Sequence, residues 1–134
     1  MNSVFEGGCL CGGLRYRLEE PPTGMNDCHC IDCRRSSGAP FVTWGCVDRG
    51  KLTIAKGEVR RIPHAQRVRS FAACCGTHVF FEDAPDSDTV DVTIASLDDP
   101  TPFPPEITIW TEDRLPWVLL HPSRPAYKRS QRDG

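Results

Sequence analysis

Three of the eight cysteines fall within residues 28–33, at spacings that a single metal ion can use. Zn²⁺ takes four ligands in a tetrahedron, and structural sites usually draw two pairs from different parts of a fold. Cys28 and Cys30 share a face if the backbone is extended, and Cys33 then returns through a tight turn. Three ligands from one loop leave the fourth position to His29, to a distant residue, or to water and substrate, as a catalytic zinc requires.

A second candidate half-site lies near the N-terminus. Cys9 and Cys11 are bracketed by glycines, which allow positive φ and let backbone N–H groups turn toward thiolate sulfur. The last thiols are the adjacent pair Cys74 and Cys75. Cys46 has no thiol neighbour in the sequence and is interpreted as a small buried hydrophobe.

Metal binding competes with two other uses of eight cysteines. A disulfide framework needs an oxidising compartment and a secretory signal, but the N-terminus has no basic start and no apolar run. A redox pair at Cys30 and Cys33 would be expected after a strand and before a helix, a context the sequence does not suggest. Haem attachment is excluded because Arg34 follows Cys33. We therefore favour metal binding in a soluble, cytoplasmic protein with no membrane span.

Composition fits one domain over residues 1–134, with a core over about residues 4–127 and a polar C-terminal tail. The chain is 39% hydrophobic, which allows a modest core. The formal net charge of −2 provides no general basic field, so neither nucleic acid nor an acidic membrane surface is an expected partner. The sequence leaves the oligomeric state open, a homodimer included.

Alternating apolar and polar residues predict a mainly β chain with little or no helix. The expected strands cover residues 4–6, 14–18, 41–47, 51–55, 59–62, 68–71, 78–81, 89–96 and 107–110. Residues 34–38 are expected to form one short helical turn. Residues 97–105 contain four prolines and cannot be regular structure, yet they are apolar enough to pack over something.

Several short motifs occur in one order along the chain. They are Gly-Cys-Leu-Cys-Gly at 8–12, Cys-His-Cys-Ile-Asp-Cys-Arg-Arg-Ser-Ser-Gly at 28–38, Cys-Gly at 75–76, Ser-Leu-Asp-Asp-Pro at 96–100 and Leu-Pro-Trp at 115–117. This ordered set resembles the glutathione-dependent formaldehyde-activating enzyme family, whose domain is shared with centromere protein V. The similarity covers nearly the whole chain, from Gly8 to Tyr127.

The resemblance implies a β-tent of short antiparallel strands around two zinc sites. The cysteines that match Cys28, Cys30 and Cys33 hold a catalytic zinc with an open position in that family. Those that match Cys9 and Cys11 join a later C-x-x-C pair at a structural zinc. The reaction implied joins formaldehyde to glutathione as S-hydroxymethylglutathione, and family members are grouped as carbon–sulfur lyases.

The sequence departs from the family pattern at the structural site. Counted back from Cys75, the first cysteine of the C-x-x-C pair falls on Ala72, which cannot ligate. Cys74 could substitute for it, but adjacent residues of an extended chain point to opposite faces. Both thiols could therefore bind one ion only where the backbone is kinked. A second departure is Thr108, where many members carry a histidine.

Other residues near the central motif have both a chemical and a plain interpretation. Arg34 and Arg35 could pair with carboxylates of an anionic thiol substrate, could pair with the anionic cysteine cluster itself, or could form a solvated surface pair. Asp32 could orient a neighbouring group or simply form a turn, and His29 could shuttle protons or point away from the metal. The aromatic residues Phe103, Trp110 and Trp117 could wall a pocket or belong to the core.

Three functional hypotheses follow. The first is a zinc-dependent enzyme that acts on adducts of a small thiol, such as glutathione, with a small aldehyde. The second is a zinc-stabilised binding module without catalysis. The third is thiol redox chemistry or metal sensing at Cys74 and Cys75.

Overall fold

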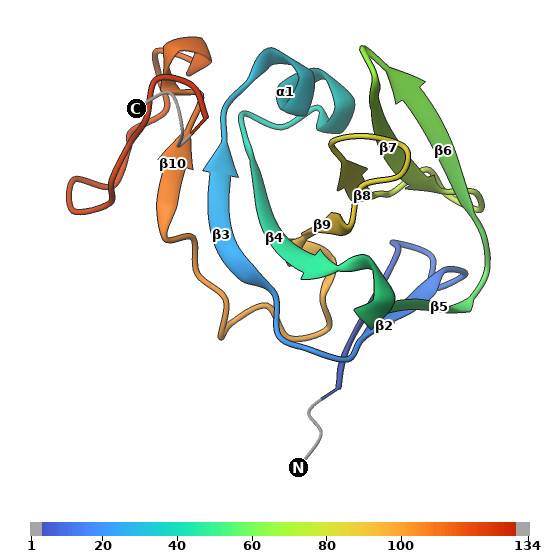
Figure 1. Cartoon of the computed structure of the whole chain (residues 1–134). Helices are drawn as coiled ribbons and strands as arrows, with labels where there is room; N and C mark the ends of the chain where they lie inside the picture. The colour runs from blue at the N-terminus through green and yellow to red at the C-terminus, as the bar shows by residue number, and fades with distance from the viewer. Residues whose placement is uncertain (1–3, 131–134) are drawn as a thin grey trace.

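Two sheets of short strands make up most of the molecule. The computed structural model describes residues 4–130, and Figure 1 shows the sheets with the short helix α1 above one end. The strands are β1 (Phe5–Gly8), β2 (Arg15–Leu18), β3 (Thr23–Cys28), β4 (Val42–Asp48), β5 (Leu52–Lys56), β6 (Val59–His64), β7 (Arg67–Ala72), β8 (His78–Glu82), β9 (Thr89–Thr93) and β10 (Ile107–Ile109). The helical elements are α1 (Ile31–Ser37) and the 3₁₀ turns η1 (Arg49–Lys51), η2 (Ile94–Ser96) and η3 (Thr111–Asp113). The predicted mainly β fold is confirmed.

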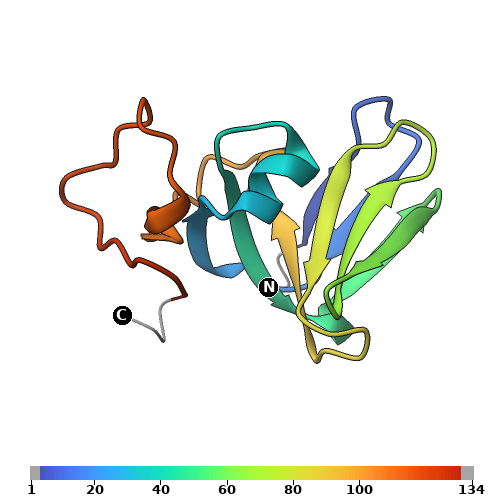
Figure 2. The same cartoon turned by 90° about the horizontal axis from the view of Figure 1, so that it is seen from above.

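The sheet topology is mostly antiparallel. The larger sheet has the order β10-β3-β4-β9-β8-β7-β6, and the smaller one has the order β1-β2-β5. Only β10 departs from the expectation, because it runs parallel to β3. Seen from above, Figure 2 places the C-terminal segment at one end of the molecule and the green strands β5–β7 at the other. None of the helices between residues 4 and 130 is long and apolar enough to cross a bilayer.

The main core joins the two sheets. On β2, Tyr16 and Leu18 are fully buried while Arg17 between them is exposed, as period-2 alternation predicts. The ring of Tyr16 meets Phe80 of β8 edge-on at 5.2 Å between centroids. Its hydroxyl lies 2.6 Å from the hydroxyl of Ser96, which satisfies the polar end of a buried side chain.

Some elements differ from the sequence-based expectations. Strand β3 was not predicted, because Met25 is the only large apolar residue among residues 23–27, so the segment shows no apolar alternation. The strand expected over residues 89–96 ends at Thr93, and η2 follows it. In the irregular segment 97–105, Phe103 is buried and packs edge-on against Phe5 at 5.4 Å, as expected of an apolar segment.

Helix α1 begins earlier than the turn expected over residues 34–38. Cys33 therefore lies within the helix and not in a tight turn. The helix starts where it does because the Cys30 sulfur accepts a hydrogen bond from the Cys33 backbone N–H at 3.3 Å, as an N-cap side chain does. It ends at Gly38, whose φ of 71° is left-handed.

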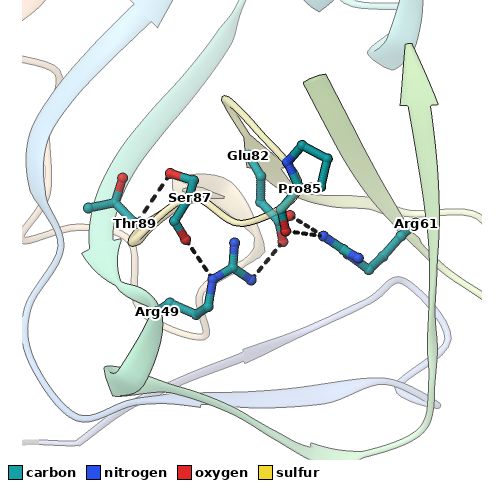
Figure 3. Close-up of polar contacts among 6 residues, drawn as sticks. All are labelled: Arg49, Arg61, Glu82, Pro85, Ser87 and Thr89. Atoms are coloured by element: carbon teal, nitrogen blue, oxygen red, sulfur yellow. Dashed lines mark hydrogen bonds and ion pairs between the residues drawn. The ribbon is translucent and has the colours of Figure 1, made fainter. Parts of the chain in front are cut away.

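A buried carboxylate joins three segments at the far end of the larger sheet (Figure 3). The side chain of Glu82, only 6% exposed, contacts Arg49 at 3.2 Å and Arg61 at 2.5 Å. The same two arginines also donate to the backbone carbonyls of Ser87 and Pro85. The interaction ties η1 and the outer strand β6 to the end of β8.

Glu82→Gln is expected to lower the free energy of unfolding by about 2 kcal/mol, because two charge-assisted hydrogen bonds are weakened at a buried position. The loss is limited because Arg49 and Arg61 are 41% and 46% exposed and can turn to water. Urea denaturation measures the change. Asp83→Asn, which breaks the exposed pair with Arg67, is the matched control. Equal losses for the two variants would contradict the special role of the buried carboxylate.

Candidate functional site

The three cysteines of the central motif meet at one point. Cys28 ends β3, Cys30 caps α1 and Cys33 lies in its first turn. Their sulfur atoms lie within 4.8 Å of one another, with Cys28 and Cys33 buried and Cys30 partly buried. Strand β4 supplies Val42 and Trp44 to the same cluster. We call Cys28, Cys30 and Cys33 the three-cysteine cluster.

Hydrogen-bond donors surround this cluster. The Trp44 indole N–H donates to the Cys33 sulfur at 3.4 Å, and the Cys33 backbone N–H donates to the Cys30 sulfur. Hydrogen bonding with Cys28 holds the pKa of Cys30 well below its usual range, and the same contact raises the pKa of Cys28 far above it. Without a bound cation, these opposite pKa shifts favour ionisation of the Cys30 thiol and oppose ionisation of the Cys28 thiol. A cation at the centre of the cluster would favour full ionisation.

His29 does not join the three sulfur atoms. Its side chain is 1% exposed, and its ring lies against Phe41 with centroids 4.8 Å apart. It also lines a cavity of about 250 Å³ beneath the C-terminal segment, together with Arg124 and Asp27. The interpretation in which His29 points away from the metal agrees with this placement. The fourth position of the cluster is not supplied by its neighbour in the sequence.

The expectation that Cys30 and Cys33 lack the strand-then-helix context of a redox pair is wrong. Cys30 and Cys33 do follow a strand, β3, and do open a helix, α1. That context was missed because β3 was missed. The nearby sulfur of Cys28 nevertheless distinguishes this arrangement from a two-thiol redox motif, since three sulfurs converge where such a motif has two.

The two arginines that follow Cys33 lie differently. Arg35 is exposed on α1, whereas Arg34 is partly buried, with its Nε atom lacking a hydrogen-bond partner. Their role toward a substrate stays a prediction. The sequence analysis missed Arg69 of β7, whose guanidinium nitrogens lie 3.9 and 4.0 Å from the Cys33 sulfur. Only the pairing of β7 with β8 brings it there, so no local motif could have identified it.

The three aromatic residues considered for a pocket wall lie in different parts of the structure. Trp110 packs against the three-cysteine cluster, with an unusual left-handed backbone at φ 59°. Phe103 belongs to the main core. Trp117 is 69% exposed and contributes to neither.

The remaining candidate ligands form a second group. Cys9, Cys11, Cys74 and Cys75 place their sulfur atoms within 4.8 Å of one another, and three of the four residues are exposed. Ala72 instead lies in the main core, 2% exposed. We call this group the four-cysteine cluster.

The backbone kink that the adjacent pair requires is present. Residues 73–75 form a turn, and the Gly76 N–H closes it onto the Ala72 carbonyl at 2.8 Å. Gly76 has a φ of +81°, which a side chain would disfavour. A Cβ on Gly13 would lie 2.8 Å from the Cys74 sulfur, so the close approach of the two loops depends on that glycine.

Hydrogen-bond donors also favour the thiolate form of cysteines in the four-cysteine cluster. The sulfurs of Cys9 and Cys11 accept backbone hydrogen bonds from Leu14 at 3.2 Å and Gly13 at 3.4 Å. The hydroxyl of Thr77 lies 3.3 Å from the Cys75 sulfur and lowers the pKa of that thiol to about 5. Both groups of sulfur donors fit a thiophilic divalent ion such as zinc.

A groove of about 590 Å³ lies between the N-terminal loop that carries Cys9 and the loop that follows α1. Its polar lining includes the hydroxyls of Ser37, Thr43 and Ser96 and the ion pair of Arg15 with Asp98. His78 also lines it, with both ring nitrogens buried and without a partner. The His78 ring meets Trp44 edge-on at 5.2 Å, so the side chains of His78 and Trp44 lie between this part of the groove and the Cys33 sulfur.

His78 is expected to stay neutral well into the acid range. Burial, followed by the charge of Arg69, lowers its pKa to about 4. Because this folded-state value lies below the unfolded value of about 6.5, the contribution of the ring to stability is complete above pH 6.5 and is lost as the pH falls toward 4. The pH dependence of the His78 imidazole C–H shifts in NMR spectra measures it. A His78 midpoint near 6.5 would contradict the prediction.

Comparisons with known proteins bear on the family and the fold. Residues 4–113 match the family model described as glutathione-dependent formaldehyde-activating enzyme. A protein of Halomonas elongata named "Putative glutathione-dependent formaldehyde-activating enzyme" is 26% identical over 127 residues, which cover 87% of this chain and 81% of that protein. A crystal structure of a Rhodobacter sphaeroides protein shares the fold, with a TM-score of 0.59 at 16% identity. That match covers 91% of this chain and 98% of the other.

Proposed function

The chain belongs to the glutathione-dependent formaldehyde-activating enzyme family, and we propose that it is a zinc-dependent carbon–sulfur lyase. Its substrates would be a small thiol such as glutathione and a small aldehyde such as formaldehyde, which combine to S-hydroxymethylglutathione or an analogous adduct. In the forward direction a C–S bond forms, the thiol loses its proton and the carbonyl oxygen gains one. The reverse direction breaks the same bond, and neither direction needs an oxidant or a reductant.

The observation that carries the proposal is the composition of the three-cysteine cluster. Within residues 4–130, the potential ligand atoms that group there are the sulfurs of Cys28, Cys30 and Cys33, with no fourth histidine, cysteine or carboxylate. Three protein ligands and one open position are typical of catalytic zinc sites. Zinc held there would lower the pKa of an incoming thiol and orient its sulfur toward the aldehyde carbon.

Other side chains of the protein would exclude water from the cluster and bind the thiol substrate. Trp44 packs against the buried sulfur of Cys33 and keeps water from that side of the cluster. The neighbouring groove, with its serine and threonine hydroxyls, is large enough for the body of a tripeptide thiol. Arg34 and Arg35 stay candidates for its carboxylates.

The four-cysteine cluster would hold a second, structural zinc through Cys9, Cys11, Cys74 and Cys75. The eight cysteines are all free thiols in the structure, as suits a reducing compartment. We therefore place the protein in the cytoplasm.

Exchange spectroscopy by NMR tests the proposed reaction. Glutathione and formaldehyde also combine without a catalyst, so the quantity to measure is the exchange rate between free and hydroxymethylated glutathione at equilibrium. The zinc-loaded protein should raise this rate above that of the buffer, and the chelator-treated protein should not. An unchanged rate with the zinc-loaded protein would reject catalysis of this exchange and leave the binding-module hypothesis.

A further inference from the structure

We propose that Arg69 makes the three-cysteine cluster selective for an anionic thiol as its fourth ligand. The inference rests on the proposed function, because it assigns a specificity-determining role at the same site. It concerns a residue 36 positions away from Cys33 in the sequence, and it replaces neither Arg34 nor Arg35 as a candidate for substrate carboxylates.

Three contacts fix the position of the Arg69 guanidinium. Two of its nitrogens lie 3.9 and 4.0 Å from the Cys33 sulfur. One of them also donates to the hydroxyl of Ser36 at 3.2 Å. The group lies over the ring of Phe81 at 4.8 Å from the centroid. Arginine is suited to this place because it can stack on an aromatic face and donate in several directions at once.

No carboxylate of the described residues pairs with Arg69, whose charge also acts on the neighbouring His78. Within residues 4–130, seven other arginines form ion pairs with carboxylates, whereas Arg69 forms none. An arginine with sulfur as its nearest anionic partner is a compensating charge for that cluster.

A count of charges gives the consequence. Three thiolates and a divalent cation carry a net charge of −1, and a thiolate in the fourth position would raise this to −2. Such an accumulation of negative charge in a half-buried site opposes binding, unless a cation lies close by. Arg69 supplies that cation, and it would favour an anionic fourth ligand much more than a neutral one. A guanidinium of purely structural importance would support both kinds of ligand alike.

The test uses the cobalt(II)-loaded protein, whose visible and near-ultraviolet absorption reports ligand exchange at the metal. The four-cysteine cluster supplies four protein ligands, so changes on titration come from the three-cysteine cluster. Glutathione is the anionic probe and imidazole is the neutral probe. Arg69→Met is expected to weaken glutathione binding about tenfold to a hundredfold, as for loss of a charge-assisted hydrogen bond, with imidazole binding nearly unchanged.

Matched variants separate charge from packing. Arg60→Met removes the same charge from an exposed position of β6 and should bind both probes as the wild type does. Arg69→Lys should recover part of the affinity for glutathione. Arg69→Gln keeps a polar contact for Ser36 without the charge and should match Arg69→Met, so it carries the test if the methionine variant does not load cobalt.

The outcomes distinguish this inference from the proposed function. If glutathione leaves the wild-type cobalt spectrum unchanged, the proposed thiol chemistry fails whatever Arg69 does. If the wild type responds and the neutral variants respond with equal affinity, the role of Arg69 is overturned while the proposed function stands. Equal weakening for glutathione and imidazole would assign Arg69 to packing alone and would also overturn the inference.

Discussion

Cys30→Ser is expected to remove one of about two zinc ions per chain and to abolish thiol exchange, while helix α1 stays folded. The Cys30 sulfur has two separable roles. It is one of the three converging sulfurs, and it caps α1 by accepting the Cys33 N–H. Serine is among the best N-cap residues, but its hydroxyl is a poor replacement for a thiolate on zinc. The substitution therefore preserves the helix and removes the ligand.

Elemental analysis of protein purified without chelator measures the zinc content, and circular dichroism reports the fold. Cys46→Ser is the matched control, because Cys46 belongs to neither cluster, and it should keep both ions. Cys30→Ala should lose the ion and the cap together, at an additional cost of about 1 kcal/mol in the free energy of unfolding. Two zinc ions per chain in Cys30→Ser would show that Cys30 is not a ligand.

The cysteine spacing predicted the three-cysteine cluster, whereas only the family resemblance joined Cys9 and Cys11 to Cys75, with Cys74 as a possible substitute for the missing ligand. Three thiols within residues 28–33 lie close together in almost any local backbone conformation. The helix start was missed because a cysteine N-cap is uncommon, and the strand before it was missed because Met25 is the only large apolar residue in it. Both errors concern local structure whose stability comes from tertiary pairing, such as β3 with β4 and β10.

Long-range geometry explains what the sequence could not provide at the site. Arg69 reaches the Cys33 sulfur only because β7 pairs with β8 in a register that places Arg69 opposite Phe81. Nothing in the local sequence of β7 distinguishes Arg69 from Arg67, which pairs with Asp83 at the surface. Several arginines in one strand are therefore equal candidates in the sequence, and the strand register determines which of them reaches the cysteine cluster.

Cys74→Ser is expected to release the second zinc and to lower the free energy of unfolding by about 4 kcal/mol. The Cys74 sulfur lies 3.6 Å from that of Cys9 and 3.3 Å from that of Cys11, across 65 and 63 residues of sequence. A metal ion shared by these residues closes a loop of that length, and closing such a loop with a cross-link is worth about 4 kcal/mol by chain entropy.

No hydrophobic packing would replace the lost connection, because Cys11, Cys74 and Cys75 are all exposed. The main core does not depend on these sulfurs, so the variant should still fold, with a lower midpoint in urea and about one zinc per chain. Ala73→Ser places the same side chain at the neighbouring exposed position of the turn and should change neither quantity. Chelation of the wild type should cost at least as much stability as Cys74→Ser, since it empties both clusters. A variant that keeps two zinc ions would mean that three of the four sulfurs suffice, and the adjacent pair would then be redundant at this site.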